Sequence, residues 1–391
     1  MSLKQSAKTL SATAILSAER VFRRPSISST PESILILEFM LPLGCCVHLT
    51  PLYEAIKRTR PHVTLTVATR GLGRALLRHH PCIDHLIDTP DPLTDTYAAA
   101  RALRSALAQR NLRPDCILTG ASDQRTRIAL LALLTGSGWR GGFTLAPQLY
   151  HRPLQYQREQ SLIDNNLQLA SLVGASANHI EPRVFFSPLD AAAVQQFIHT
   201  ANPDARPLVV FVTQNSGGQS TGWHTDRFAE VIRHAHHALG CAIVYAGTAA
   251  DVEAIEHIRT SAGGIGTSLA GCTSVTQLAA LLAISDAAVS LDTGTMHIGR
   301  AVGTPMVVLG PSWQRPIEWL PLELPHVRIL RGPDRPDVPP GYRLEEIQAP
   351  DVIATLENLL KAYPACAADR ATRLAASTST IDHTVGLAEI R

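Results

Sequence analysis

The chain has 391 residues, of which 45% are apolar and 17% charged, a balance that suits two folded domains and excludes general disorder. Its formal net charge of +2 gives no electrostatic reason to expect a nucleic-acid partner. Seven cysteines without any Cys-x-x-Cys pair are typical of reduced, buried thiols, so we expect a cytoplasmic protein without a structural metal. No apolar run approaches the roughly 20 residues of a membrane span.

Residues 1–31 are expected to form an N-terminal extension without a signal peptide. An apolar helix face is predicted from Leu10, Ala14, Ile15, Ala18, Val21 and Phe22. Two interpretations remain open: a helix packed on the body of the protein or a loose terminus, or an interfacial helix that brings the protein to a membrane surface.

From residue 32 short apolar runs alternate with amphipathic ones, which predicts a first domain over residues 32–180. The predicted strands are 34–37, 63–68 and 115–118, and the predicted helices are 47–58 and 128–134. Such strand–helix alternation is typical of a doubly wound α/β domain with a parallel sheet.

The alternation starts again after Pro207, which predicts a second domain of the same kind over residues 181–345. The predicted strands are 208–212, 242–245, 287–290 and, as the last one, 306–309; the predicted helices are 227–239, 252–258, 275–284 and 296–302. A further helix is expected within 346–364, and the Ala-, Ser- and Thr-rich tail 365–391 is expected to be mobile. We therefore predict two Rossmann-like domains facing a cleft.

The segment 287–305 is the most informative for function. A buried strand ends at Asp292, and Thr293, Gly294 and Thr295 are predicted to turn into a helix that carries His297. Free amides and the positive end of the helix dipole would then face the carboxyl edge of the sheet, where a diphosphate binds well. An ordinary helix capped by Asp292 or Thr293 would give the same local pattern.

The same segment resembles the signature of glycosyltransferase family 9, the heptosyltransferases of lipopolysaccharide synthesis. The family pattern is Asp-Ser/Thr-Gly, two residues and His, followed by a small-residue helix, Pro, an apolar strand and Gly. Two further stretches are similar to the family, the Trp-containing stretch 222–230 and the first glycine loop 43–51. The similar parts are Asp292–His297, Pro305, Leu309–Pro311, Gly222–Glu230 and Leu43–Pro51.

The resemblance implies a GT-B fold, with the donor in the C-terminal domain and the acceptor in the N-terminal one. It implies inverting, metal-independent sugar transfer from a nucleotide sugar, commonly ADP-heptose, to a glycan or lipid-linked glycan. No cofactor beyond this co-substrate is implied. The predicted donor-binding residues are Ser216, Asp251, Asp292, Thr293, Gly294, Thr295, Met296 and His297.

Two positions depart from the family pattern. Cys45 stands where the family has the Asp proposed as general base, and a thiol is a poor substitute for a carboxylate. Thr221 stands where the family has a Lys that pairs with the donor phosphates. Since inverting transfer needs a base for the acceptor hydroxyl, we consider Asp123 first, then His48 and Glu38, each of which has a simpler interpretation as a hydrogen-bonding loop residue.

Other patterns indicate less. Gly71-Leu-Gly73 follows a strand but lacks the third glycine of a dinucleotide fingerprint. His234, His236 and His237 lie on an amphipathic helix, where solvated positions are more common than metal ligands.

The leading hypothesis is an active glycosyltransferase, and the alternative is a degenerate protein that binds a nucleotide sugar without catalysis. A sugar-nucleotide epimerase or hydrolase is a third interpretation, for which no clear acid–base pair is present.

Overall fold

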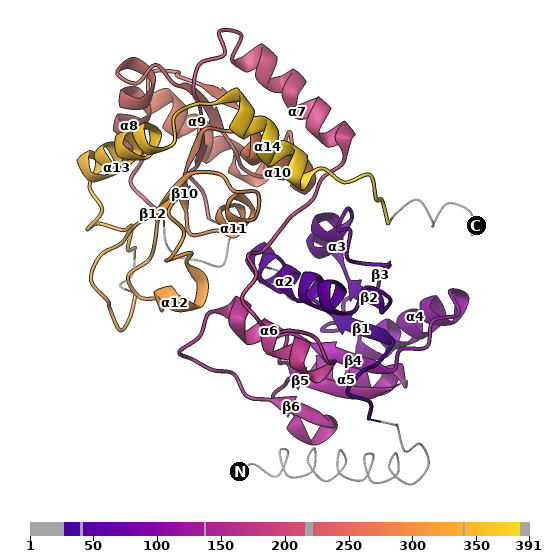
Figure 1. Ribbon diagram of the computed structural model, residues 1–391. Helices are drawn as coiled ribbons and strands as arrows, with labels where there is room; N and C mark the ends of the chain where they lie inside the picture. Colours follow the sequence, from indigo (N-terminus) through magenta and orange to yellow (C-terminus); the bar gives the residue numbers. More distant parts are fainter. Residues whose placement is uncertain (1–26, 40–41, 137, 216–221, 339–340, 384–391) are drawn as a thin grey trace. The chain divides into compact units, whose positions relative to one another are not determined.

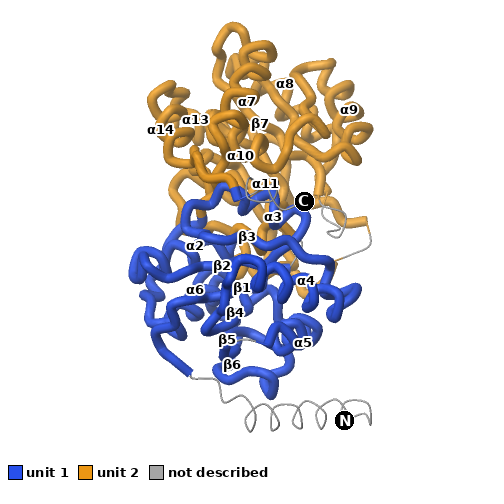
Figure 2. The backbone as a smooth tube through the Cα atoms, turned by 90° about the vertical axis from the view of Figure 1, so that its right-hand side faces the viewer, with its two compact units in different colours: residues 1–41, 48–182, 383–391 blue, residues 42–47, 183–382 orange. Residues whose placement is uncertain are grey.

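The computed structural model describes residues 27–39, 42–136, 138–215, 222–338 and 341–383. The chain divides into two compact units, drawn in different colours in Figure 2. Unit 1 comprises 1–41, 48–182 and 383–391, and unit 2 comprises 42–47 and 183–382. The main break between Pro182 and Arg183 lies two residues from the boundary expected at residue 180.

Unit 1 holds a six-stranded parallel sheet in the order β3-β2-β1-β4-β5-β6. The strands are β1 (Ser33–Leu37), β2 (Thr64–Thr69), β3 (His85–Asp88), β4 (Cys116–Thr119), β5 (Trp139–Phe143) and β6 (Arg152–Leu154). The helices are α2 (Leu43–Thr59), whose first residues group with unit 2, α3 (Gly71–Leu77), α4 (Thr96–Gln109), α5 (Thr126–Thr135), the short η1 (Pro147–Leu149) and α6 (Leu162–Leu172).

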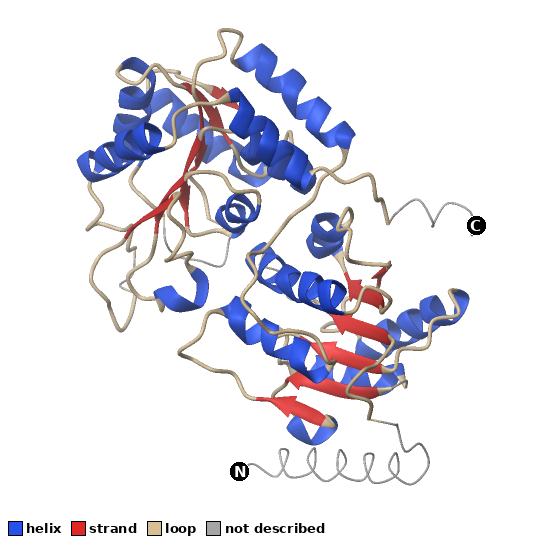
Figure 3. Ribbon diagram, in the orientation of Figure 1, coloured by secondary structure: helices blue, strands red, loops and turns tan. Residues whose placement is uncertain are grey.

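Helices cover both faces of this sheet, as Figure 3 shows. Helices α4 and α5 pack on the face that carries Leu35, Leu37 and Ile117. The other face carries α2 and α6, where the Asn166 amide of α6 donates a hydrogen bond of 3.1 Å to the His48 carbonyl of α2. Burial on both faces explains why strands such as β1 and β4 are continuous apolar runs rather than alternating ones.

Unit 2 repeats the design with the order β12-β11-β10-β7-β8-β9. Figure 1 shows its sheet with helices on both sides. The strands are β7 (Leu208–Val212), β8 (Ala242–Tyr245), β9 (Thr267–Ser268), β10 (Ala287–Leu291), β11 (Met306–Leu309) and β12 (Val327–Leu330). The helices are α7 (Pro188–Ala201), α8 (Thr225–His237), η2 (Ala249–Asp251), α9 (Val252–Ser261), α10 (Val275–Ile284), α11 (Gly294–Ala301), α12 (Pro316–Trp319), α13 (Ala349–Ala362) and α14 (Ala367–Ser377).

Both sheets have the strand order of a Rossmann fold, in which the direction of winding reverses next to the first strand. In unit 1 the reversal lies between β1 and β4, and in unit 2 between β7 and β10. Ligands of such sheets bind at the carboxyl ends of these strands. The loops after β4 and β10 are therefore the places to look for functional side chains.

Three predictions about helices, strands and the C-terminal tail were wrong. Helix α2 begins at Leu43 rather than Val47, so Gly44, Cys45 and His48 are helical and not part of a loop. Strand β11 is not the last one, because β12 pairs with it in parallel. The expected mobile tail contains α14, which is fixed by the ion pair of Arg370 with Asp286 at 3.2 Å and by further hydrogen bonds.

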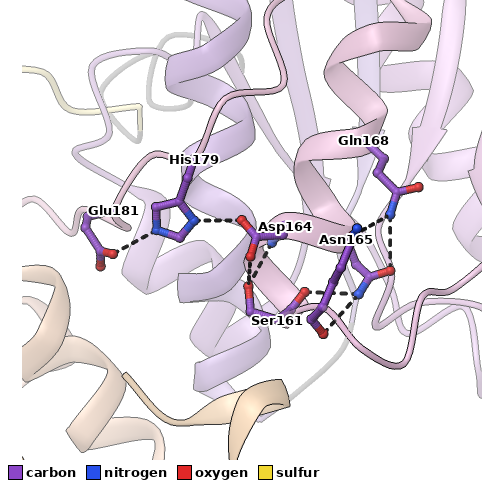
Figure 4. A network of polar contacts seen from close by, with 7 residues as sticks. Ser161, Asp164, Asn165, Gln168, His179 and Glu181 are labelled. Atoms are coloured by element: carbon purple, nitrogen blue, oxygen red, sulfur yellow. Dashed lines mark hydrogen bonds and ion pairs between the residues drawn. The ribbon is translucent and has the colours of Figure 1, made fainter. Parts of the chain in front are cut away.

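The segment that precedes the break at Pro182 is tied to helix α6 (Figure 4). The imidazole of His179 lies between two carboxylates, with Nδ1 2.6 Å from Asp164 Oδ1 and Nε2 2.9 Å from Glu181 Oε1. Asp164 also accepts a hydrogen bond from the hydroxyl of Ser161, the N-cap residue of α6. One histidine thus joins the connecting segment to the first turn of α6.

The part of the chain that the structure describes holds no helix with both the length and the apolarity needed to span a bilayer. The predicted apolar face of residues 10–22 lies outside the described residues.

Candidate donor-binding site at the N-terminus of α11

The candidate site begins where β10 ends beside β7. Strand β10 is buried along its whole length, and Asp292 and Thr293 connect it to α11. The N–H groups of the first turn of α11 therefore lie at the carboxyl edge of the sheet and point outward from it, next to the strands between which the winding reverses. The first amides of this eight-residue helix have no partner within the helix, so they offer donors and partial positive charge to an anion at this point.

Thr293 occupies the N-cap position of α11 without acting as a cap. Its backbone is extended, with φ of −142°, and its side chain makes no capping hydrogen bond. Its Oγ1 is buried and has no hydrogen-bond partner among the described residues. The interpretation of Thr293 or Asp292 as an ordinary side-chain cap is therefore not realised among the described residues, and the buried Thr293 hydroxyl lies beside the first amides of α11.

Asp292 and His297 form the ionisable part of the site. Asp292 Oδ1 and His297 Nε2 are 3.8 Å apart, and both side chains are about 5% exposed. Burial raises the pKa of Asp292 to about 6. Burial, with a smaller contribution from the charge of Arg300, lowers the pKa of His297 to about 3. At neutral pH His297 is thus uncharged, and Asp292 is close enough to its pKa that a small fall in pH protonates it.

The rest of the predicted donor residues differ in what they can offer. Gly294 and Thr295 are partly exposed at the first turn of α11, whereas the side chain of Met296 is buried and leaves only its backbone for a ligand. Asp251 closes a capping box: its Oδ2 accepts hydrogen bonds of 2.7 Å from both the amide and the hydroxyl of Thr248. Ser216, like Thr221, lies outside the described residues.

The predicted bases lie in unit 1 and are buried. Asp123 follows β4. Its carboxylate accepts a hydrogen bond from the Phe39 amide at 2.5 Å and forms an ion pair with Arg125. His48 lies inside α2, and Glu38 follows β1; both are about 1% exposed. The geometry of Asp123 is that of a structural loop carboxylate, so its role as a base, like that of His48, stays a prediction.

Several residues near the donor segment were not foreseen. The ring of Trp319, in α12, lies 6.3 Å from the ring of His297, with 59° between their planes. Arg331, just after β12, donates to the backbone carbonyls of the loop that leads to α12. No sequence pattern would have predicted this placement, because Trp319 stands in a very short helix within a Pro-rich stretch and Arg331 is a single charge.

No group of three or more His, Cys, Asp or Glu side chains is arranged to hold a metal ion within the ranges that the structure describes. The seven cysteines, all of them described, form no disulfide bond with one another, and Cys45 is buried in the first turn of α2.

Two sheets with the strand order of a Rossmann fold, with a helix N-terminus at the carboxyl edge of the second, are the general design found in many nucleotide-binding proteins. A sequence model of glycosyltransferase family 9 (heptosyltransferase) matches residues 125–323, slightly more than half of the chain. The chain belongs to this family. Comparison with curated protein sequences gave no match.

Solved structures of the family have the same fold. A family 9 glycosyltransferase from Veillonella parvula DSM 2008 superposes with a TM-score of 0.76 at 19% identity, covering 85% of this chain and 98% of that one. The ADP-heptose lipopolysaccharide heptosyltransferase II of E. coli gives 0.70 at 21% identity, covering 84% and 99%. E. coli heptosyltransferase WaaC with ADP-2-deoxy-2-fluoro heptose gives 0.63 at 18% identity, covering 83% and 99%. The expected fold class, two Rossmann-like domains of the GT-B type, is confirmed.

Proposed function

We propose that the chain binds a nucleoside-diphosphate sugar, with ADP as the first nucleotide to test, at the N-terminus of α11. The observation that carries this proposal is the buried Thr293 hydroxyl, which has no hydrogen-bond partner among the described residues and does not cap the first amides of α11. An unsatisfied buried donor is costly unless a ligand completes it. One solved relative has ADP-heptose in its name, and another is described with ADP-2-deoxy-2-fluoro heptose, which supports this choice of donor.

The proposed reaction is an inverting transfer of the sugar, with heptose as the first candidate, to a glycan or lipopolysaccharide-like lipid-linked acceptor. The amides of α11 would stabilise the diphosphate as it leaves, so that no divalent metal is needed. Inversion requires that the acceptor hydroxyl attack the anomeric carbon from the face opposite the diphosphate while a base takes its proton. We further propose peripheral contact with the inner membrane surface through residues 1–31.

A second candidate function is non-catalytic binding of a nucleotide sugar. The observation in its favour is that the proposed bases are poorly placed. Asp123 is committed to the Phe39 amide and to Arg125, His48 is buried within a helix, and Cys45 is a buried thiol. In this form of the proposal the donor site at α11 is kept and the transfer step is lost.

Release of nucleoside diphosphate from the sugar nucleotide, measured with and without acceptor, separates the two functions. An acceptor-dependent release from ADP-heptose is expected for a transferase, and it should persist in excess EDTA. Loss of activity in EDTA with recovery on adding Mg²⁺ contradicts the metal-independent mechanism. Donor binding in calorimetry without release, over a panel of lipid-linked and free glycans, supports the binding protein. Absence of donor binding rejects both functions.

A further inference from the structure

The loop that follows β11 is held by the guanidinium of Arg331. Its Nη2 donates to the carbonyls of Pro311, Ser312 and Gln314 at 3.3, 3.2 and 3.2 Å. The Arg331 side chain is only 18% exposed and also pairs with Asp334 at 2.6 Å. Three carbonyls bound by one planar, preorganised cation restrict the path of the loop.

The same loop is fixed from a second side by Glu346. One carboxylate oxygen of Glu346 accepts hydrogen bonds from the hydroxyls of Ser312 and Tyr342. The guanidinium of Arg335 lies over the Tyr342 ring at 5.2 Å, and its backbone amide donates to the Ser312 carbonyl at 2.9 Å. Residue 312 is therefore bound through both its side chain and its backbone.

Helix α12 follows directly and ends at Trp319. The next residue, Leu320, is buried under Gly310 at the end of β11, where an added Cβ would lie 3.2 Å from Leu320 Cδ1. These anchors on both sides of α12 fix the position of Trp319. Trp313 in the same loop packs against the hydrophobic core of unit 2, whereas Trp319 contacts His297 of the donor segment and remains partly exposed.

We propose that Trp319 is the platform on which the sugar of the donor rests, and so a residue that determines which sugar is accepted. This inference rests on the proposed function of the α11 site. His297 lies one helical turn from Gly294, where the diphosphate would bind, and the ring centroid of Trp319 is 6.3 Å from that of His297. A sugar attached to the distal phosphate therefore has an aromatic surface beside it.

The chemistry of the two partners fits. One face of a pyranose ring is lined by C–H bonds, which are apolar and slightly positive, and the face of an indole is apolar and negative. Binding sites commonly combine such an aromatic wall with a few polar groups that fix orientation. Neutral His297 adds a hydrogen-bonding group at the edge of this wall. The wall contacts the sugar and not the nucleotide, so its contribution is confined to the sugar part of the donor.

The experiment compares the affinities of a nucleotide sugar and of its nucleoside diphosphate by calorimetry. The probe pairs are ADP and ADP-heptose, UDP and UDP-glucose, and GDP and GDP-mannose, and the pair that wild type binds best is used throughout. Trp319→Leu should weaken nucleotide-sugar binding about three- to tenfold, the size of one aromatic stacking contact. Binding of the nucleoside diphosphate alone should change less than twofold, and Trp319→Phe should restore most of the loss.

Ile317→Ala, on the same short helix, is the matched control and should bind both probes as wild type does. The inference is overturned if Trp319→Leu weakens both members of a pair equally, because that indicates a general structural role. It is also overturned if neither affinity changes. Wild-type protein that binds none of the three pairs rejects the proposed function itself, and the inference with it.

Discussion

Asp123 joins the carboxyl ends of two neighbouring strands, because its carboxylate accepts a hydrogen bond from the Phe39 amide after β1 while its own loop follows β4. The same carboxylate pairs with Arg125, whose side chain is one-third exposed. At the position where the winding of the unit 1 sheet reverses, this residue therefore has a structural role, whether or not it also takes a proton.

The first prediction separates these two roles. Asp123→Asn removes the charge that Arg125 faces and should lower the free energy of unfolding by about 1.5–3 kcal/mol, the range for hydrogen bonds to a charged group. If Asp123 is also the general base, turnover should fall by roughly 10²–10⁴-fold under conditions where the variant is still fully folded. Chemical unfolding and single-turnover kinetics on the same preparation measure both.

Arg125→Gln is the control, since it removes the ion pair but keeps the carboxylate. Comparable losses of stability with normal turnover in both variants would leave Asp123 a structural residue only. Cys45→Ser should be mild in every assay. A dead Cys45→Ser variant beside a normal Asp123→Asn would assign the direct role to Cys45 instead.

The second prediction concerns the hydroxyl of Thr293. Thr293→Val keeps the shape of the side chain and removes a buried polar atom without a partner in the described structure, so stability should be unchanged or higher. Donor affinity should fall roughly ten- to hundredfold if the hydroxyl binds a charged phosphate. Calorimetry with ADP-heptose and thermal unfolding are the two measurements.

Thr304→Val is the control and should have the opposite effects on stability and on donor affinity. The buried hydroxyl of Thr304 donates to the Leu282 carbonyl at 2.8 Å, so this variant should lose stability and keep its donor affinity. Unchanged donor affinity in Thr293→Val would mean that the phosphates bind elsewhere than at the start of α11.

The third prediction follows from the raised pKa of Asp292. Burial shifts this pKa to about 6, so Asp292 is protonated at a higher pH in the folded protein than an ordinary carboxyl group is. At pH 7 its carboxylate is mostly charged and repels a nearby anion. Affinity for the donor should therefore increase as the pH falls through about 6. A nucleotide sugar is the right probe, because both of its phosphates are esterified and lack the second ionisation near pH 6 that a free phosphate monoester has.

Asp292→Asn should bind the donor with little dependence on pH between about 5 and 7.5, since the titrating group is gone. His297 does not produce the effect, because its pKa of about 3 lies below this range. A wild-type pH profile that stays in Asp292→Asn would locate the titrating group outside this pair.

The sequence predicted the alternating architecture and the donor segment, because fully buried strands such as β7 and β10 are short apolar runs between amphipathic helices. It missed β5, since its sequence Trp-Arg-Gly-Gly-Phe contains Arg140, a buried charge whose Nε donates to the carbonyl of Leu149, nine residues further along the chain. It also missed the order in α14, which depends on contacts of Arg373 with the carbonyls of Ala283 and Ser285, about 90 residues away.

In the candidate site, too, the sequence predicted local features but not contacts between remote residues. The residues from Asp292 to His297 are contiguous, so a local pattern identified them. The burial of Asp123 and the approach of Trp319 to His297 depend on partners remote in the chain, and a local pattern contains no information about them. Position after a strand indicated that Asp123 lies at a sheet edge, but not that its oxygens are already engaged.

The last prediction concerns His179, which joins the segment before Pro182 to α6 (Figure 4). Burial favours the neutral imidazole, but the hydrogen bonds and charges of Asp164 and Glu181 act in the opposite direction and leave the pKa of His179 raised. A raised pKa in the folded state means that this contact contributes stability fully below the ordinary histidine pKa of about 6.5, and that the contribution is lost as the pH rises through the folded-state value.

His179→Gln removes the titration and keeps a hydrogen-bonding side chain, so the melting temperature of wild type should exceed that of the variant most at about pH 6 and least at about pH 9. Since the ring is half exposed, the difference should also shrink in high salt. Glu181→Gln, which keeps the imidazole but removes one carboxylate, should show a smaller difference with the same direction of pH dependence. A difference between wild type and His179→Gln that is constant from pH 6 to 9 would mean that the protonated imidazole contributes nothing to holding this segment on α6.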